Sequence, residues 1–330
     1  MNTAAIDIIV LTYNQADYIE QALDGIQAQQ ISVPYRVVIA DDMSTDDTLE
    51  RIKKFERKHN LKFDYLTADK NLGMVANYRR AIHAVEADFC CMLEGDDYWT
   101  NPHKLQMQYD YMKANCDCLL CYTDCDIIDH DIPSNSVQGV FRTAHRELNA
   151  DQPLLENLYQ ANVTWMLSRD LLQHIVLPDN CTDIPLVFMY EACLHGKLYF
   201  MSETTAVYRL HSGSVSSCVT NGNRGGYYRY SRNVFLLQVG YIPKFPQQDE
   251  TRKIIFSDAL RFVYPYACEI GDKEITDIIE NYFADRLDLN VVKNMYGKIE
   301  NLELKLSKLE NSRKYRLGSF LLKPLDILKK

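Results

Sequence analysis

The sequence predicts an α/β fold with a mostly parallel central sheet, followed by a helical extension and a C-terminal tail. Two observations predict the sheet. The first 125 residues alternate short apolar runs with segments of helical periodicity, which is typical of parallel strands joined by crossover helices. Polar residues follow the ends of these runs, and open α/β sheets bind ligands at the carboxyl ends of their strands. We therefore expect a ligand site at one edge of the sheet.

The expected strands are the short apolar runs, which lie at residues 6–12, 35–40, 63–66, 89–93 and 119–123. A helix is expected after the second run, because Ser44 and Asp47 have the spacing of a capping box. Leu49, Ile52 and Phe55 follow at helical spacing, which indicates that this helix buries one face.

Composition limits the class of function. The chain has 330 residues, of which 47% are hydrophobic, and a formal net charge of −9, which argues against nucleic-acid binding because that needs a basic surface. We find no apolar run of about 18 residues and no basic-then-apolar leader, so we expect a cytoplasmic protein.

Four cysteines at 116–125 stand in an apolar setting, which indicates a buried strand with reduced thiols rather than a zinc site.

Two pairs of adjacent carboxylates end expected strands. Asp96 and Asp97 follow the fourth run, and Asp41 and Asp42 follow the second. Neighbouring carboxylates both stay ionised only beside a cation or strong donors, and Mg²⁺ or Mn²⁺ can bind such oxygens together with the phosphates of a nucleotide diphosphate. The alternative is a solvated turn, where Asp is common. Neither G-x-G-x-x-G nor the P-loop pattern occurs, which argues against nicotinamide and P-loop chemistry.

A series of motifs resembles family 2 of the glycosyltransferases over residues 4–216. The motifs are, in order, IIVLTYNQADYIEQAL, VVIADDMSTDDT, NLGMVANYRRAI, MLEGDDYWTNPHKLQMQ, VTWMLSRDLL, TDIPLVFMYEACLHGK and VYRLHSGSVS. The resemblance implies a GT-A-type fold, which is a single Rossmann-like domain. We expect this catalytic domain at residues 1–216, the helical extension at 217–290, and a short coiled coil with a basic amphipathic tail at 291–330.

The resemblance also implies roles for individual residues. Those implied to contact the donor are Thr12, Tyr13 and Asn14 in the nucleotide pocket, Asp42 at the base, Asn71 and Asn77 beside the donor, and Asp96 near the ribose and the metal. Asp97 is implied as the direct metal ligand, and Glu94 stands where the family's D-x-D element has its first Asp. His211 resembles a position that approaches the metal or diphosphate, and its alternative is a hydrogen-bonded structural histidine. Arg209 is a further candidate for the diphosphate charge.

An inverting transferase needs a carboxylate that takes the proton of the acceptor hydroxyl. Asp183 stands where the family carries this base, although Thr182 replaces the usual Glu. The alternative role of Asp183 is a helix N-cap, and the two roles are compatible. Trp99 and Trp165 are candidates to stack on sugar rings, with core packing as the alternative.

The last forty residues form a basic tail. Between residues 293 and 330 stand ten Lys or Arg and four Asp or Glu, so this segment carries +6 and residues 1–292 carry −15. Apolar residues at steps of three and four from Val292 to Leu309 predict a short coiled coil, which favours a homodimer or an intramolecular helix pair. The amphipathic stretch 312–330 predicts contact with a membrane surface, with packing on protein as the alternative.

The function expected from these features is transfer of a sugar from a nucleotide diphosphate donor, with UDP-sugars favoured by the resemblance. The acceptor would be a hydroxyl of a saccharide or lipid-linked saccharide in cell-surface polysaccharide synthesis, and the cofactor Mn²⁺ or Mg²⁺. The protein would act in the cytoplasm or peripherally at the inner face of the cell membrane. Two alternatives are an inactive nucleotide-sugar-binding scaffold and a sugar nucleotidyltransferase.

Overall fold

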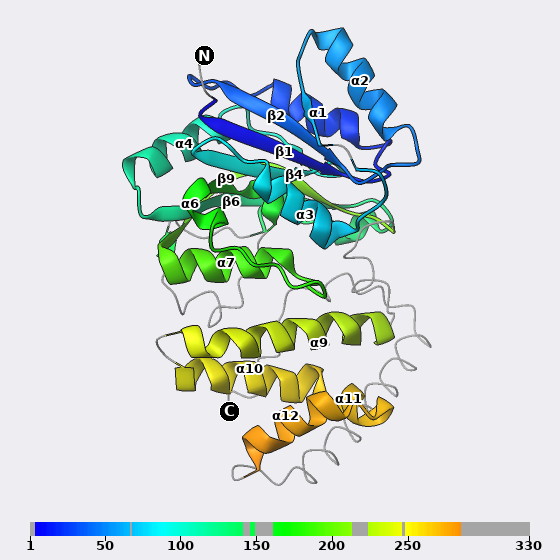
Figure 1. Ribbon diagram of the computed structural model, residues 1–330, viewed down its shortest axis with the longest axis vertical. Helices are drawn as coiled ribbons and strands as arrows, with labels where there is room; N and C mark the ends of the chain where they lie inside the picture. Colours follow the sequence, from blue (N-terminus) through cyan, green and yellow to red (C-terminus); the bar gives the residue numbers. More distant parts are fainter. Residues whose placement is uncertain are drawn as a thin grey trace.

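The computed structural model of the chain describes residues 4–66, 68–140, 146–148, 161–212, 224–245 and 248–284. An α/β layer contains the sheet, and a second layer consists of helices (Figure 1). Helix α7, which spans Ile184–His195, lies between them. The coiled coil and amphipathic tail expected at 291–330 lie outside the described residues.

The N-terminal half of the sheet is parallel, as expected. Its strands are β1 (Ile6–Thr12), β2 (Tyr35–Asp41), β3 (Asp64–Tyr65) and β4 (Phe89–Glu94), which lie in the order β3-β2-β1-β4. The β1 strand pairs in parallel with both β2 and β4. The carboxyl ends of these three strands therefore meet at one edge.

The other half makes the sheet mixed rather than mostly parallel. Its strands are β5 (Tyr98–Trp99), β6 (Cys118–Asp129), β7 (Arg146–Leu148), β8 (Met166–Ser168) and β9 (Lys197–Leu210). Strand β8 lies antiparallel between β4 and β6, whereas β6 and β9 are parallel. A three-residue strand has too short an alternation to be read from a sequence. The cysteines of β6 behave as predicted, since Cys118, Cys121 and Cys125 are buried and free of disulfides.

Helices cover both faces of the sheet. They are α1 (Ile19–Gln27), α2 (Thr48–His59), α3 (Met74–His83), α4 (Lys104–Ala114), α6 (Arg169–Leu172) and α7. One core cluster joins α1, α2 and α4 to Ile6, Ile8 and Val10, and a second joins α3, α6 and α7 to Ile9 and Leu11. Successive β1 side chains thus enter opposite cores, which fixes the register of the strand.

The prediction of a capping box at Ser44 is wrong. Helix α2 begins at Thr48, its N-cap residue Asp47 makes no side-chain capping bond, and Ser44 lies in the preceding loop. The Ser44 hydroxyl instead donates to Asp41 Oδ1 at 2.5 Å, and the Ser44 N–H donates to Asp41 Oδ2 at 2.9 Å. The Ser44 oxygen accepts from the Asn14 N–H at 2.9 Å, so its partners are in the loops and it does not take the place of a helix cap.

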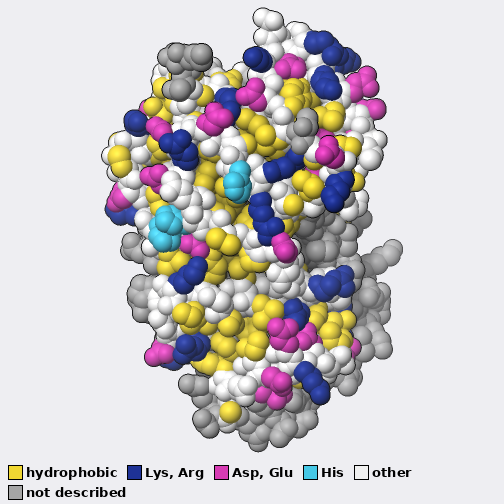
Figure 2. Space-filling view, viewed as in Figure 1, with side chains coloured by type: hydrophobic (Ala, Val, Ile, Leu, Met, Phe, Trp, Pro, Cys, Tyr) yellow, Lys and Arg dark blue, Asp and Glu magenta, His cyan; other side chains and the backbone are white. Residues whose placement is uncertain are grey.

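The helical layer consists of α9 (Arg224–Tyr241), α10 (Gln248–Phe262), α11 (Tyr264–Ile270) and α12 (Lys273–Phe283). Its own apolar cluster includes Tyr190 of α7, so α7 belongs to both cores. In Figure 2 hydrophobic side chains gather at the level of α7 and of α9 and α10, among charged ones. Within the part of the chain that the structure describes, no helix has both the length and the apolar character needed to cross a bilayer.

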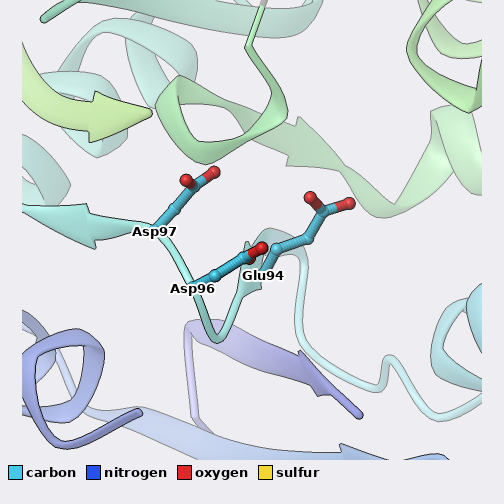
Figure 3. A group of neighbouring side chains, drawn as sticks. All are labelled: Glu94, Asp96 and Asp97. Atoms are coloured by element: carbon cyan, nitrogen blue, oxygen red, sulfur yellow. The ribbon is translucent and has the colours of Figure 1, made fainter. Parts of the chain in front are cut away.

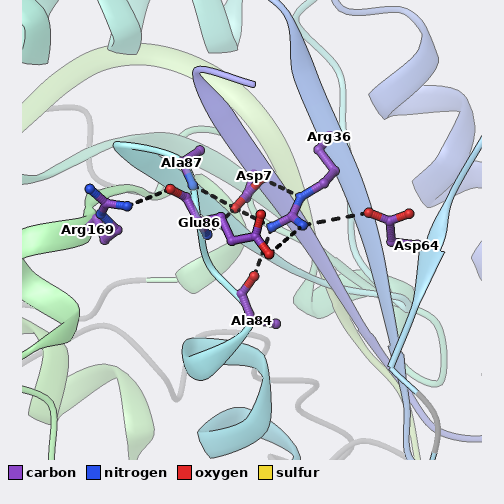
Figure 4. A network of polar contacts seen from close by, with 7 residues as sticks. All are labelled: Asp7, Arg36, Asp64, Ala84, Glu86, Ala87 and Arg169. Atoms are coloured by element: carbon purple, nitrogen blue, oxygen red, sulfur yellow. Dashed lines mark hydrogen bonds and ion pairs between the residues drawn. The ribbon is translucent and has the colours of Figure 1, made fainter. Parts of the chain in front are cut away.

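A buried ion pair joins the first strands (Figure 4). Asp7 of β1 accepts two hydrogen bonds from Arg36 of β2, each at 2.8 Å, and further bonds from the N–H groups of Glu86 and Ala87 at 2.7 and 3.0 Å. Burial alone raises the pKa of Asp7, but the Arg36 guanidinium and these N–H groups outweigh it, so the pKa lies below its ordinary value.

Exchange of Arg36 for Leu is expected to lower the free energy of unfolding by about 3 kcal/mol, because the Asp7 charge would stay buried without its cation. Urea denaturation followed by circular dichroism measures this loss. Asp64→Asn is the matched control, since Asp64 is half exposed and lies 3.7 Å from Arg36. Its expected effect is about 0.5 kcal/mol. Equal losses for the two variants would contradict the assignment.

Candidate active site

The centre of the candidate site is the acidic turn of Glu94, Gly95, Asp96 and Asp97 between β4 and β5. The Gly95 N–H donates to the Leu11 carbonyl oxygen at 2.9 Å, which carries the β1–β4 ladder into the turn. A side chain at Gly95 would place its Cβ 2.6 Å from Gln15 Oε1 and 2.9 Å from Ile19 Cδ1, so a larger residue would have to displace these side chains.

The turn brings three carboxylates together. Ligand atoms of Glu94, Asp96 and Asp97 all lie within 4.8 Å of one another, and Figure 3 shows the three side chains directed to a common region. Burial raises the pKa of Asp97 well above its ordinary value, and the charges of Asp96 and Glu94 add to this. Burial and the Asp96 charge raise the pKa of Glu94 in the same way. This cluster needs a positive charge to remain ionised.

Two of these oxygens fit a bound metal ion. Asp96 Oδ1 and Asp97 Oδ2 are buried and have no hydrogen-bond partner among the described residues. Burial of a carboxylate oxygen without a hydrogen-bond partner costs free energy of folding unless a cation binds the oxygen. Because hard oxygen ligands of this kind suit Mg²⁺ or Mn²⁺, the residues predicted as metal ligands fit that group.

The end of β9 supports the turn. The Arg209 N–H donates to Asp97 Oδ1 at 2.8 Å, and its guanidinium donates to the Asp96 carbonyl oxygen and to Gln21 Oε1. Arg209 is 3% exposed and its guanidinium lies over the Tyr98 ring, so its observed contacts place its positive charge against the acidic turn. Contact of Arg209 with a diphosphate stays a prediction.

The candidate metal ligand His211 does reach the acidic turn. His211 Nε2 lies 3.1 Å from Asp96 Oδ2, and its ring lies 4.8 Å from the ring of Tyr18. Both predicted roles of His211 are therefore compatible with this position.

Sequence reasoning missed the residues that hold Glu94. The Tyr78 hydroxyl donates to Glu94 Oε1 at 2.6 Å, and Asn162 Nδ2 donates to the same oxygen at 3.0 Å. These partners are 16 and 68 positions away along the chain. No local pattern marks them, because packing of α3 and of the segment before β8 decides the contacts.

The predicted nucleotide residues lie in the loop after β1. Thr12 is buried and its Oγ1 has no hydrogen-bond partner among the described residues, while Tyr13 is 44% exposed. Asn14 has a positive φ of 53°. Its side-chain oxygen accepts from the Thr45 N–H at 2.7 Å, and its own N–H donates to Ser44 Oγ at 2.9 Å. Asn14 thus joins the loops after β1 and β2.

A second pair of loops meets at Asp42, the predicted base contact. Asp42 Oδ1 accepts from the Leu72 N–H and Oδ2 from the Gly73 N–H, both at 2.8 Å. Asn71 is exposed beside them and accepts from the Gly73 N–H at 3.0 Å. The structure therefore brings Asp42 and Asn71 into one region.

Asn77 differs from its expected place beside the donor. It is buried in α3, where Nδ2 donates to the Ala40 carbonyl oxygen at 2.9 Å and Oδ1 accepts from Arg80 Nε at 2.7 Å. Both amide atoms are committed to the protein, so its observed contacts brace α3 against β2.

Asp183 is the N-cap of α7 and lies outside the acidic cluster. Its Oδ1 accepts from the Leu186 N–H at 3.1 Å, and its Oδ2 accepts from the Tyr230 hydroxyl at 2.6 Å. The N-cap alternative is thus confirmed. Burial raises the pKa of Asp183, and the bonds from Tyr230 and Leu186 oppose that rise.

The two tryptophans belong to the core. Trp99 and Trp165 are 3% and 2% exposed, and Trp99 Nε1 donates to the Val163 carbonyl oxygen at 2.8 Å. Trp165 packs against Phe188 of α7, with ring centroids 5.8 Å apart. The structure therefore favours core packing over sugar stacking for both.

A curled mixed α/β sheet with carboxylates after β4 defines a GT-A-like fold. A sequence model of glycosyl transferase family 2 matches residues 7–176, which is over half of the chain. The chain therefore belongs to glycosyl transferase family 2.

Two similar proteins each match just under two thirds of the chain. An uncharacterised protein of Mycobacterium tuberculosis is 31% identical over 208 residues, which are 63% of this chain and 59% of the relative, so the chain spans little more than half of that relative's length. The putative teichuronic acid biosynthesis glycosyltransferase TuaG of Bacillus subtilis is 26% identical over 213 residues, covering 64% of this chain and 81% of the relative.

Two solved structures share the fold. The structure of Staphylococcus aureus TarS 1-349 in complex with UDP-GlcNAc has a TM-score of 0.60 at 20% identity, covering 79% of this chain and 74% of the other. The mannosyltransferase PcManGT of Pyrobaculum calidifontis, in complex with GDP-Man and Mn²⁺, has a TM-score of 0.55 at 15% identity, covering 91% of this chain and 81% of the other.

Proposed function

We propose that the protein is an inverting glycosyltransferase that moves a sugar from a nucleotide diphosphate donor, with UDP-sugars favoured, to a hydroxyl of a saccharide or lipid-linked saccharide in cell-surface polysaccharide synthesis. The observation that carries the proposal is the pair of unpartnered buried oxygens in the acidic turn after β4. The names of relatives support it, because TuaG is named for teichuronic acid biosynthesis and TarS as a poly(ribitol-phosphate) β-N-acetylglucosaminyltransferase.

We assign the metal and donor roles to residues at the sheet edge. Asp97, Asp96 and His211 would hold Mn²⁺ or Mg²⁺, which supplies charge neutralisation to the departing nucleotide diphosphate. Glu94 shapes the turn through its bonds to Tyr78 and Asn162. The residues proposed to contact the donor are Thr12, Tyr13, Asn14, Asp42, Asn71 and Asp96, whereas the buried Asn77 would brace α3 behind them.

Asp183 would act as the base. It takes the proton of the acceptor hydroxyl as the oxygen bonds to the anomeric carbon and the bond from that carbon to the diphosphate oxygen breaks. Attack from the face opposite to the leaving group inverts the configuration. Proton transfer to a positioned carboxylate accounts for a factor of about 10²–10⁴ in rate.

A donor screen tests the proposal. Purified full-length protein is incubated with UDP-, GDP- and TDP-sugars, with Mn²⁺ or with a chelator, and release of the nucleoside diphosphate is measured. We expect release from one nucleotide class only in the presence of the metal. A scaffold would bind a donor without turnover, and a nucleotidyltransferase would release pyrophosphate from a nucleoside triphosphate. Either result would overturn the proposal.

The proposal also includes the domain bounds, with the catalytic domain ending at residue 216 and the helical extension ending at residue 290. It further includes two roles for the tail. Membrane contact at the inner face of the cell membrane and a homodimer are assigned to residues 291–330 from the sequence pattern alone. Co-sedimentation with anionic liposomes and sedimentation velocity of the full chain measure the two properties separately.

A further inference from the structure

We propose that Tyr230 of α9 is a positioning residue for Asp183, so that the helical layer forms part of the active site. The inference rests on the proposed role of Asp183 as the base. The Tyr230 hydroxyl donates to Asp183 Oδ2 at 2.6 Å, while the Leu186 N–H donates to Oδ1 at 3.1 Å. Two donors from two different helices therefore fix the plane of one carboxylate.

The carboxylate keeps access to a space that an acceptor could enter. Asp183 lines a cavity of about 560 Å³ whose walls come from α7, from the loop before it and from α9. The wall from α9 includes Asn233, Val234 and Leu237. Each carboxylate oxygen has a second lone pair, so the bonds from Tyr230 and Leu186 orient Asp183 without using up its capacity to accept a proton.

Protonation states suit this role. Burial raises the pKa of Tyr230 far above its ordinary value, and the Asp183 charge adds to the rise, so the phenol stays a donor. Its bond in turn favours the ionised form of Asp183, against the effect of burial. Cys181 in the preceding loop and Tyr190 of α7 also lie near Asp183, and the cavity that Asp183 lines is lined in addition by His174, Glu191, His195, Tyr241 and Lys244. Tyr230 is thus the hydroxyl donor that the described residues provide to this carboxylate.

Other residues of α9 make hydrogen bonds that hold this helix against its neighbours, and these bonds do not involve Asp183. Asn233 Nδ2 donates to the Asn180 carbonyl oxygen at 3.3 Å, and Gln238 Nε2 donates to the Tyr190 hydroxyl at 3.3 Å. The Tyr241 hydroxyl donates to Glu191 Oε1 at 2.7 Å. Tyr241 is therefore a matched control for Tyr230, because it makes the same phenol–carboxylate bond between the same two helices.

The experiment compares Tyr230→Phe with Tyr241→Phe. Its measurement is the pH dependence of kcat for metal-dependent hydrolysis of the sugar nucleotide selected by the donor screen, with the donor KM and the melting temperature. At low pH kcat should fall as Asp183 becomes protonated, and we call this part of the profile the acid limb. For Tyr230→Phe we expect the acid limb to move to higher pH by about one unit. At a pH below the limb, kcat should therefore fall about tenfold, with donor KM unchanged. Tyr241→Phe is expected to lower the melting temperature and leave the pH profile in place.

A second substitution tests the opposite direction and keeps the fold. Incorporation of 3-fluorotyrosine at position 230 makes the phenol a stronger donor, so the acid limb is expected to move to lower pH. A folded Tyr230→Phe protein with the wild-type acid limb and kcat would overturn the inference, as would equal shifts for Tyr230→Phe and Tyr241→Phe. If Asp183→Asn hydrolyses the donor at the wild-type rate, the assignment of the base fails instead.

Discussion

Exchange of Asp97 for Asn is expected to abolish metal-dependent turnover, with a loss of about 10³-fold or more, because several kcal/mol of charge stabilisation at the diphosphate depend on the metal. The exchange keeps the acceptor for the Arg209 N–H, so the turn should keep its shape. Binding of Mn²⁺ in the presence of the nucleoside diphosphate, followed by calorimetry, should be lost together with turnover.

The thermal stability of the Asp97→Asn protein separates a metal role from a structural one. Removal of one of three clustered carboxylates relieves repulsion among them, so the metal-free variant should melt at or above the wild-type temperature. Asp110→Asn on the exposed face of α4 is the matched control, with expected wild-type turnover and melting. A variant that unfolds, or that keeps normal metal-dependent turnover, would refute the assigned role.

Exchange of Asp183 for Asn is the second change with a large expected effect. Transfer should fall by about 10²–10⁴-fold, because an amide cannot accept the acceptor proton. Affinity for the donor with Mn²⁺ should stay unchanged, since Asp183 lies outside the acidic turn. Asn is also a good N-cap, so α7 should keep its start at the Leu186 N–H.

A matched control for this exchange lies in the helical layer. Like Asp183, Asp272 is a helix N-cap: it begins α12, accepts from the Ile275 N–H at 3.4 Å and accepts from the Tyr228 hydroxyl at 2.7 Å. Unlike Asp183, it also accepts from Arg232 Nε at 2.8 Å. Asp272→Asn is expected to cost stability and to leave kcat unchanged. Similar losses of kcat in both variants would mean that the effect at Asp183 is structural.

The N-terminal half of the fold could be predicted from the sequence. The run at 6–12 coincides with β1, and the other runs meet β2, β3, β4 and β6 within a few residues, apart from the longer C-terminal end of β6. Helix α2 followed from Ile52 and Phe55, both of which are buried. Strand β8, the mixed character of the sheet and the true partner of Ser44 did not follow, because pairing between distant segments decides each of them.

Part of the candidate site could likewise be predicted from the sequence, and part could not. Glu94, Asp96 and Asp97 share one turn, and the end of an apolar run placed it at the sheet edge. His211 approaches Asp96, 115 positions away, and its approach to a metal or diphosphate stays a prediction. Asn77 was assigned to the donor by the family resemblance, and Trp99 and Trp165 to sugar stacking by residue type. The structure instead uses the amide of Asn77 and the two indole rings inside the protein.

The sequence by itself determined the parallel half of the sheet, the acidic turn and the family, because periodicity and short motifs are local along the chain. Only the tertiary structure decided which carboxylate oxygens lack partners among the described residues, that Arg209 donates to the acidic turn, and that Tyr230 of a separate helix contacts Asp183. Such contacts depend on where elements far apart in the chain pack against each other, and no local pattern of residues encodes that packing.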